Sequence, residues 1–135
     1  MRLVETPVRV RYAETDRMGI VYHAHYIVWF EIGRTDYCRA AGEPYRALED
    51  SGLWILVTGV DCKYRGSARY DDALRVRTTL PELASRGLSF RYEIVNEQDR
   101  LLAEGSTRHV FADSQGRLRR APAEVVERLE SFRSS

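Results

Sequence analysis

The chain has 135 residues and a net charge of +1, and 44% of its residues are hydrophobic and 30% charged. This length fits one domain, residues 1–135, with a core of its own, and the composition excludes a disordered chain. The nearly neutral charge excludes the basic field typical of nucleic-acid-binding proteins. No apolar run is long enough to span a bilayer, and the N-terminus lacks a signal-peptide core. We therefore expect a soluble, cytoplasmic protein without a membrane span or a nucleic-acid partner.

The first third of the chain predicts a strand followed by a buried helix. Residues Pro7–Tyr12 alternate apolar and charged side chains, which indicates a strand with one solvated face. From about His25 to Ala41 the chain is apolar on most sides, which predicts a helix that is buried on most sides. A short helix is expected from about Pro44 to Ser51. The polar residues expected to form a narrow exposed strip on the long helix are Glu31, Arg34 and Arg39.

Four strand-like segments follow one another, joined by short turns, and Pro122–Phe132 predicts a terminal helix with proline in its first turn. Sequential strands with short links favour an antiparallel sheet. That sheet must cover the apolar helix, so the most economical architecture is α+β, with a curved sheet wrapped around one helix. The four segments are Trp54–Tyr64, Asp72–Leu83, Leu88–Glu97 and Leu101–Asp113.

The approach to the long helix combines a carboxylate, a glycine and a helix N-terminus. The first backbone N–H groups of a helix lack partners within it and carry partial positive charge. A carbonyl oxygen bound there is polarised, and one such donor contributes about 10²–10³ in rate. Gly19 lets the backbone approach a ligand closely, and Asp16 is near enough in sequence to act as base or nucleophile. These parts suit acyl transfer on an ester, an amide or a thioester, and the reactive thioester matches so sparse a site best.

Simpler interpretations stay open for the same residues. Asp16 also suits a turn or a helix-capping position, and His23 also suits a packed or surface position. A metal site at His23 and His25 would need a third ligand, and His109 is the one other histidine. The sequence has no GxxxxGK[ST] loop, no G-x-S-x-G elbow and no CxxC pair. We therefore expect neither a metal nor a cofactor.

The stretch "YAETDRMGIVYHAHYIVWFEIGRTDY" (Tyr12–Tyr37) resembles the signature of the hot-dog-fold acyl-CoA thioesterases. The similarity is to the 4-hydroxybenzoyl-CoA thioesterase family and, within it, to the Tol–Pal-associated acyl-CoA thioesterase branch. A second block, "SARYDDALRVRTTL" (Ser67–Leu80), also matches, and the resemblance covers most of the chain. It implies a hot-dog fold, in which a curved antiparallel five-stranded sheet wraps around one long central helix. It also implies hydrolysis of acyl-CoA thioesters to a carboxylic acid and CoA.

The resemblance further implies roles for individual residues. Asp16 matches the family's catalytic carboxylate, acting as nucleophile or as general base on water. The N–H of His23 matches the family's carbonyl-polarising donor, and its ring matches a histidine of the Tol–Pal-associated branch that assists water or the leaving thiolate. Gly19 and Tyr22 are expected to shape the substrate pocket. Of the basic cluster that binds nucleotide phosphates in the hydroxybenzoyl branch, Arg86 alone remains. Arginines considered as substitutes are Arg65, Arg69 and Arg119.

The resemblance implies homo-oligomers, dimers or tetramers, with sites between subunits, and acyl-CoA or an acyl-carrier-protein thioester as substrate. A long strand such as Leu101–Ala112, with few residues that blunt an edge, would be an aggregation risk if left open. Two alternative functions stay open. One is a hydratase or dehydratase of the same fold, with Asp16 and His23 as an acid–base pair. The other is a non-catalytic acyl-CoA-binding module. The sequence does not determine the acyl group.

Overall fold

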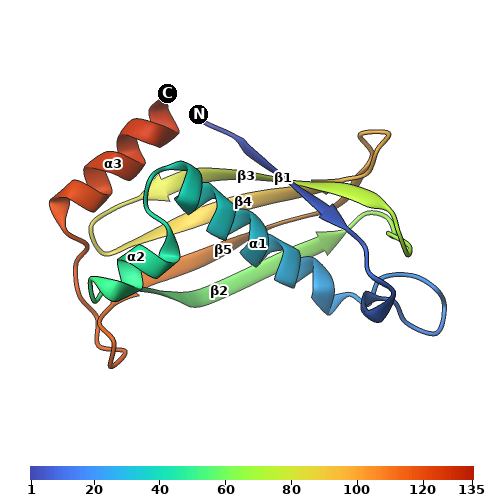
Figure 1. The fold of residues 1–135 in the computed structure, drawn as a ribbon, viewed down its shortest axis with the longest axis horizontal. Helices are drawn as coiled ribbons and strands as arrows, with labels where there is room; N and C mark the ends of the chain where they lie inside the picture. The colour runs from blue at the N-terminus through green and yellow to red at the C-terminus, as the bar shows by residue number, and fades with distance from the viewer.

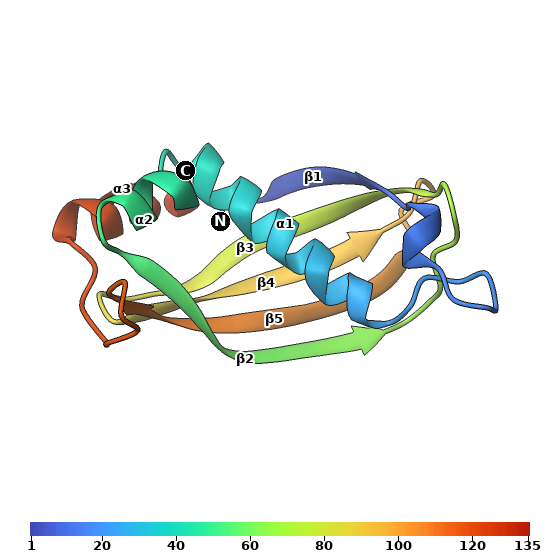
Figure 2. The same cartoon turned by 60° about the horizontal axis from the view of Figure 1, so that its bottom comes forward.

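The computed structural model describes residues 1–135. All five strands pair antiparallel in one sheet of order β1-β3-β4-β5-β2. Figures 1 and 2 show α1 lying across the concave side of this curved sheet, with α2 and α3 toward one end. The predicted α+β architecture is therefore confirmed. In chain order the elements are β1 (Val4–Arg9), the 3₁₀ turn η1 (Tyr12–Glu14), α1 (Ala24–Ala40), α2 (Tyr45–Asp50), β2 (Trp54–Tyr64), β3 (Ala73–Leu83), β4 (Gly87–Val95), β5 (Leu101–Ala112) and α3 (Ala123–Ser134).

The first strand differs most from its prediction. It covers residues 4–9, whereas the alternating pattern predicts residues 7–12. Its partner β3 begins at Ala73, directly opposite Arg9, so the ladder ends there although the alternation continues. The next residues instead form η1, in which Glu14 is buried.

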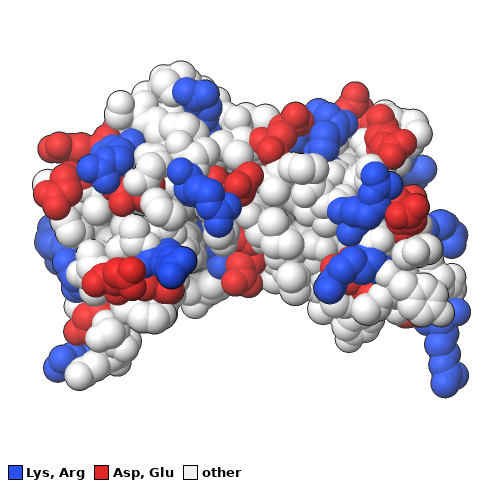
Figure 3. Space-filling model, viewed as in Figure 1, with Lys and Arg blue, Asp and Glu red and all other residues white.

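The polar strip predicted for the long helix is wrong at Arg34. This side chain is only 7% exposed, and its Nε donates a 2.7 Å hydrogen bond to the hydroxyl of Tyr45 in α2. The apolar residues Ile27, Val28 and Ile32 are exposed instead. One sheet covers only one side of a helix, so apolar side chains on the other side remain open. Figure 3 shows an uncharged area at the centre of the face that carries α1.

A glycine lets α1 lie close to the sheet. A Cβ atom at Gly33 would lie 2.5 Å from Thr78 Oγ1 and 2.7 Å from Val76 Cγ1, both on β3. One turn earlier, the Phe30 ring stacks on the Tyr92 ring of β4 with centroids 4.5 Å apart. These contacts fix the helix against the sheet and therefore fix where its N-terminus lies.

The two edges of the sheet are β1 and β2. The strand Leu101–Ala112, considered above as a risky open edge, is β5 and lies between β4 and β2. β1 is short and contains Pro7, which blunts an edge. β2 has 11 residues, and its side chains Leu56, Val57 and Val60 are exposed. β2 is therefore the edge that remains suited to pairing.

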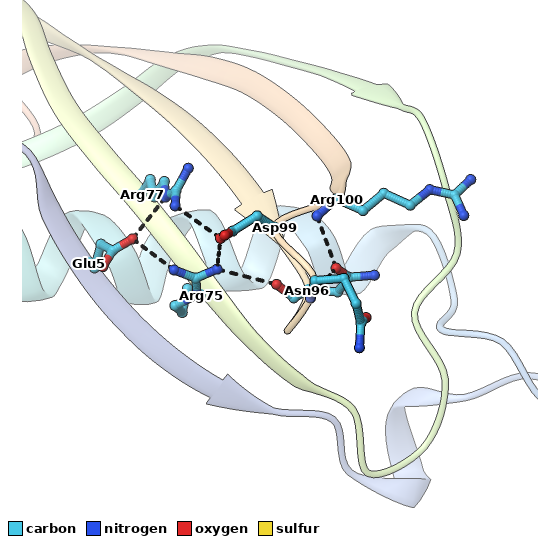
Figure 4. Close-up of polar contacts among 7 residues, drawn as sticks. Glu5, Arg75, Arg77, Asn96, Asp99 and Arg100 are labelled. Atoms are coloured by element: carbon cyan, nitrogen blue, oxygen red, sulfur yellow. Dashed lines mark hydrogen bonds and ion pairs between the residues drawn. The ribbon is translucent and has the colours of Figure 1, made fainter.

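The face of the sheet away from α1 carries ion pairs. Glu5 of β1 lies 3.4 Å from an Arg75 guanidinium nitrogen and 2.8 Å from one of Arg77, both on β3. Asp99, in the β4–β5 turn, contacts the same two arginines. Figure 4 shows these side chains in front of the sheet, with α1 behind it. Ion pairs this exposed contribute little to stability because solvent screens them, so they mark a solvated surface.

Candidate active site

Asp16 lies in a short loop that folds back on itself. A backbone bridge between Thr15 and Val21 closes the loop, and the Asp16 N–H donates to the Ile20 carbonyl oxygen at 2.8 Å. Gly19 turns the chain with φ of +78°, in the left-handed region that favours glycine. The Gly19 N–H donates to the Asp16 carbonyl oxygen at 3.0 Å. Asp16 therefore begins the tight turn of the loop, directly beside the bridge that closes it.

The Asp16 carboxylate is exposed, and one of its oxygens has a partner. Oδ1 accepts a 2.8 Å hydrogen bond from the Met18 N–H. This is the turn role that the simpler interpretation of Asp16 expects. Oδ2 has no hydrogen-bond donor within the chain, so the turn leaves one carboxylate oxygen free for chemistry.

Helix α1 begins directly after this loop, with His23 as its N-cap residue. Neither the His23 N–H nor the Ala24 N–H has an acceptor within the chain. Two unpaired backbone donors therefore lie at the positive end of the helix dipole. Such donors can polarise a carbonyl oxygen and stabilise the negative charge that develops on it.

Aromatic side chains surround this end of the helix. The Tyr22 ring lies 4.5 Å from the His23 ring, centroid to centroid, and the Tyr64 ring at the end of β2 meets His23 edge-on at 6.2 Å. The Tyr64 hydroxyl donates a 3.0 Å hydrogen bond to the His23 carbonyl oxygen. Burial raises the pKa of Tyr64 to about 12. Sequence reasoning missed Tyr64.

The structure brings together four of the five predicted site residues: Asp16, Gly19, Tyr22 and His23 lie in the loop and at the helix start. Arg86 lies in the β3–β4 turn, at the opposite end of the sheet (Figure 1). β3 has 11 residues between the two ends, which corresponds to about 35 Å of extended chain. Arg86 is therefore distant from Asp16 of the same chain.

Arg86 borders a basic cleft that the sequence revealed only in part. The cleft has a volume of about 460 Å³. Its arginines Arg119 and Arg120 donate only to neutral acceptors, the carbonyl oxygens of Gly52 and Arg120 and the Ser85 hydroxyl, so their positive charge is not compensated by a carboxylate. Guanidinium groups suit phosphate binding. The residues that line the cleft are Arg86, Val110, Phe111, Leu118, Arg119 and Arg120.

The other two arginines considered as phosphate ligands lie elsewhere. Arg65 forms an ion pair with Glu104 at 3.1 Å. The backbone of Arg69 forms a bridge with Ile20, beside the Asp16 loop. Of the three proposed substitutes, only Arg119 joins Arg86 in the basic cleft.

The remaining titratable groups form no second site of the expected kinds. No three His, Cys, Asp or Glu side chains gather where they could hold a metal ion. His109 is buried on β5, where its Nε2 lies 2.7 Å from Thr107 Oγ1. Burial raises the pKa of the Cys38 thiol to about 12, so this thiol is inert at neutral pH. None of the helices combines the length and apolar character that crossing a bilayer requires.

Comparison with known proteins identifies the family. A sequence profile described as the thioesterase-like superfamily matches residues 10–129. The acyl-CoA thioester hydrolase YbgC of Escherichia coli O6:H1 is 34% identical over 111 residues, which cover 82% of this chain and 83% of that protein.

Solved structures agree with this assignment. The crystal structure of the protein TT1821 from Thermus thermophilus is 40% identical, with a TM-score of 0.92 over 97% of this chain and 98% of that one. The DHNA-CoA thioesterase of Staphylococcus aureus is 30% identical, with a TM-score of 0.93 over 99% and 93% of the two chains. The expected hot-dog fold and thioesterase resemblance are confirmed, and the chain belongs to the thioesterase-like superfamily of hot-dog-fold enzymes.

Proposed function

We propose that this chain hydrolyses acyl-CoA thioesters to a free carboxylic acid and CoA. The observation that carries the proposal is the Asp16 loop, which leads directly into a helix whose first N–H groups, at His23 and Ala24, have no acceptor. Similarity to an acyl-CoA thioester hydrolase and to a DHNA-CoA thioesterase supports a CoA thioester as the substrate.

The reaction follows from these groups. The thioester carbonyl oxygen binds the N–H groups of His23 and Ala24, which polarise the carbonyl carbon toward attack. Asp16 either attacks that carbon, forming a mixed anhydride that water then hydrolyses, or takes a proton from the attacking water. The C–S bond breaks, and the CoA thiolate leaves and takes up a proton. The His23 ring assists the water or the leaving thiolate, while Gly19 and Tyr22 border the substrate.

A second copy of the chain completes the site in this proposal. Along β2, Ile55 pairs with Phe111 beside the basic cleft, whereas Tyr64 at the other end contacts His23. If two copies pair their β2 edges antiparallel about a twofold axis, the Asp16 end of each copy lies beside the cleft end of the other. The partner subunit's Arg86 and Arg119 then bind the CoA phosphates. A dimer of such dimers gives the homotetramer.

The acyl group has an apolar place to lie. Val57 and Val60 on β2 pair with His109 and Thr107 of β5, which are buried beneath the helices. Residues paired across strands share a face, so both valines face the side of the sheet that holds α1. They are exposed, as is Ile27 on α1. An acyl chain or an aromatic ring placed between them removes this apolar surface from water.

Replacement of Asp16 tests the proposed function. Asp16→Asn and Asp16→Ala are expected to lower thiol release from acyl-CoA at least about a hundredfold, because each removes the nucleophile or base. Circular dichroism should show that both variants keep the wild-type fold. A screen over short, long and aromatic acyl-CoA thioesters defines the acyl group in the same assay. A folded Asp16→Ala protein with near-wild-type turnover would exclude Asp16 from the mechanism.

The alternative functions give different results with the same proteins. A hydratase or dehydratase would remove the enoyl absorbance of crotonyl-CoA without releasing free thiol. A non-catalytic binding module would bind acyl-CoA without any turnover. The proposed hydrolase releases thiol in amounts equal to the acid that it forms.

A further inference from the structure

Glu14 is a buried carboxylate that the proposed reaction does not use. Its side chain is inaccessible to substrate, at only 4% exposed. Oε1 accepts a 2.8 Å hydrogen bond from the Arg11 N–H, and Oε2 accepts a 3.1 Å hydrogen bond from the Trp29 indole N–H. A buried carboxylate is costly unless donors satisfy it, and here each oxygen has one.

The backbone of Glu14 connects to the start of α1. Its carbonyl oxygen accepts a 2.9 Å hydrogen bond from the N–H of Tyr22, the residue before the N-cap. The next residue, Thr15, forms the bridge with Val21 that closes the Asp16 loop. Glu14 therefore lies at the base of this loop, two residues before Asp16, which begins its tight turn.

Trp29 attaches the base of the Asp16 loop to helix α1. It lies in the second turn of α1 and is only 1% exposed. Its ring packs edge-on against Tyr26 with centroids 5.1 Å apart, and the Tyr26 hydroxyl accepts a 3.0 Å hydrogen bond from the Ala68 N–H. The Glu14–Trp29 hydrogen bond thus joins the loop to a part of the helix that moves only with the core.

We propose that Glu14 is a positioning residue, whose bond to Trp29 holds Asp16 at a fixed place relative to the first N–H groups of α1. This inference rests on the function proposed for Asp16. Rates fall steeply when reacting groups are misplaced, by about a hundredfold for about 1 Å. Both hydrogen-bond partners of the Glu14 side chain are N–H donors, and an ionised carboxylate offers two acceptor oxygens. The exposed Arg11 guanidinium also lies 3.6 Å from Oε2.

Glu14→Gln tests the proposal because the amide keeps the size but has one acceptor oxygen. One donor, either the Arg11 N–H or the Trp29 N–H, then faces an NH₂ group, and the loop must shift. We expect kcat to fall about tenfold to a hundredfold, with KM changed less than about twofold. In a Trp29→Phe background one donor is gone and the Gln oxygen can serve the other. Glu14→Gln should therefore lower kcat much less there, a non-additive result in a double-mutant cycle.

Glu43→Gln is the matched control. Glu43 is also a buried carboxylate, 5% exposed, and it pairs with Arg128 of α3, far along the chain from the Asp16 loop. We expect Glu43→Gln to lower the melting temperature about as much as Glu14→Gln does while leaving kcat unchanged. If Glu14→Gln behaves in the same way, Glu14 is a structural residue only and the proposal is wrong.

An Asp16→Asn arm separates the two proposals. If Asp16→Asn loses activity while Glu14→Gln keeps wild-type kcat, only the positioning role of Glu14 fails. If Asp16→Asn keeps activity, the proposed function itself fails. Should Glu14→Gln not fold, Glu14→Asp keeps the charge but shortens the side chain by one methylene, so it cannot reach both donors. A folded Glu14→Asp protein with wild-type kcat would also contradict the proposal.

Discussion

His109 is a buried histidine whose surroundings lower the pKa of its imidazole. Its Nε2 lies 2.7 Å from Thr107 Oγ1, and its Nδ1 has no partner. Burial, together with the positive charge of the Arg34 guanidinium, lowers the pKa of His109 to about 3. The imidazole is therefore neutral in the folded protein at neutral pH, and Thr107 in turn bonds to the Tyr92 hydroxyl at 2.6 Å.

We expect His109 to contribute to acid sensitivity. Its pKa is about 6.5 in an unfolded chain and about 3 in the folded protein, so below about pH 6.5 the unfolded state binds one more proton. The free energy of unfolding should then decrease as pH falls, by up to about 1.4 kcal/mol per pH unit from this group. His109→Gln takes up no proton, so its stability in urea titrations should decline less between about pH 6.5 and pH 4. Equal declines in both proteins would contradict a buried neutral imidazole.

At the scale of elements, β2 is the longer of the two strands whose outer edges lack a neighbour. It follows α2 in sequence but pairs with β5, and this long-range pairing puts it at the edge of the sheet. Val57 is 49% exposed there, next to a register shift between Val57 and Gly59. An exposed apolar edge of this length is a template for another chain, which is why the proposed dimer forms along β2.

Val57→Lys should convert the protein to monomers at micromolar concentration. The substitution places a charge on each copy near the twofold axis and leaves the ammonium to be desolvated in the interface. Analytical ultracentrifugation measures the change in oligomeric state. Leu3→Lys is the control, since Leu3 is 46% exposed just before β1, near the other edge. If Leu3→Lys gives monomers and Val57→Lys does not, the dimer uses the β1 edge.

At the scale of the whole molecule, the candidate catalytic loop and the basic cleft lie at opposite ends of one sheet. The Asp16 loop is beside the end of β2, and Arg86 is in the β3–β4 turn (Figure 1). A CoA thioester has a reactive end and a phosphate-rich end, so it can use both features only if they come from different subunits. In the proposed dimer, hydrolysis is therefore a property of the assembled oligomer.

Subunit mixing tests this shared site. Arg86→Ala should raise KM for acyl-CoA about tenfold or more, because a charged hydrogen bond to phosphate is lost, while Asp16→Asn should lower kcat. If Asp16 and Arg86 of different subunits form one site, refolding the two variants together should restore about a quarter of the sites to wild type. At acyl-CoA concentrations well below KM, the activity of the mixture should then exceed the mean of the activities of the two separate variants. Activity equal to that mean would indicate that both residues act within one chain.

Local patterns were enough to predict most of the elements and the candidate catalytic segment. Strand alternation and an apolar helix depend on neighbouring residues, so the elements could be placed from the sequence. The first strand is shifted from its prediction because its partner β3 begins at Ala73, opposite Arg9. Asp16, Gly19 and His23 lie within one short stretch, so no long-range contact was needed to bring them together. Glu14 stands in the same stretch, but only its burial and its bond to Trp29 distinguish it from a surface acid.

The sequence by itself determined the family, most of the secondary structure and the loop that carries Asp16, because each of these depends on residues that are contiguous in the chain. Tertiary structure alone decided that Arg34 is buried and that β2 lies at an open edge of the sheet. It alone decided that Arg120 lies beside Arg86 and that Tyr64 bonds to the helix start from 41 residues away. These features depend on which segments pack together, and a one-dimensional pattern of apolar and polar residues does not encode which strand lies beside which.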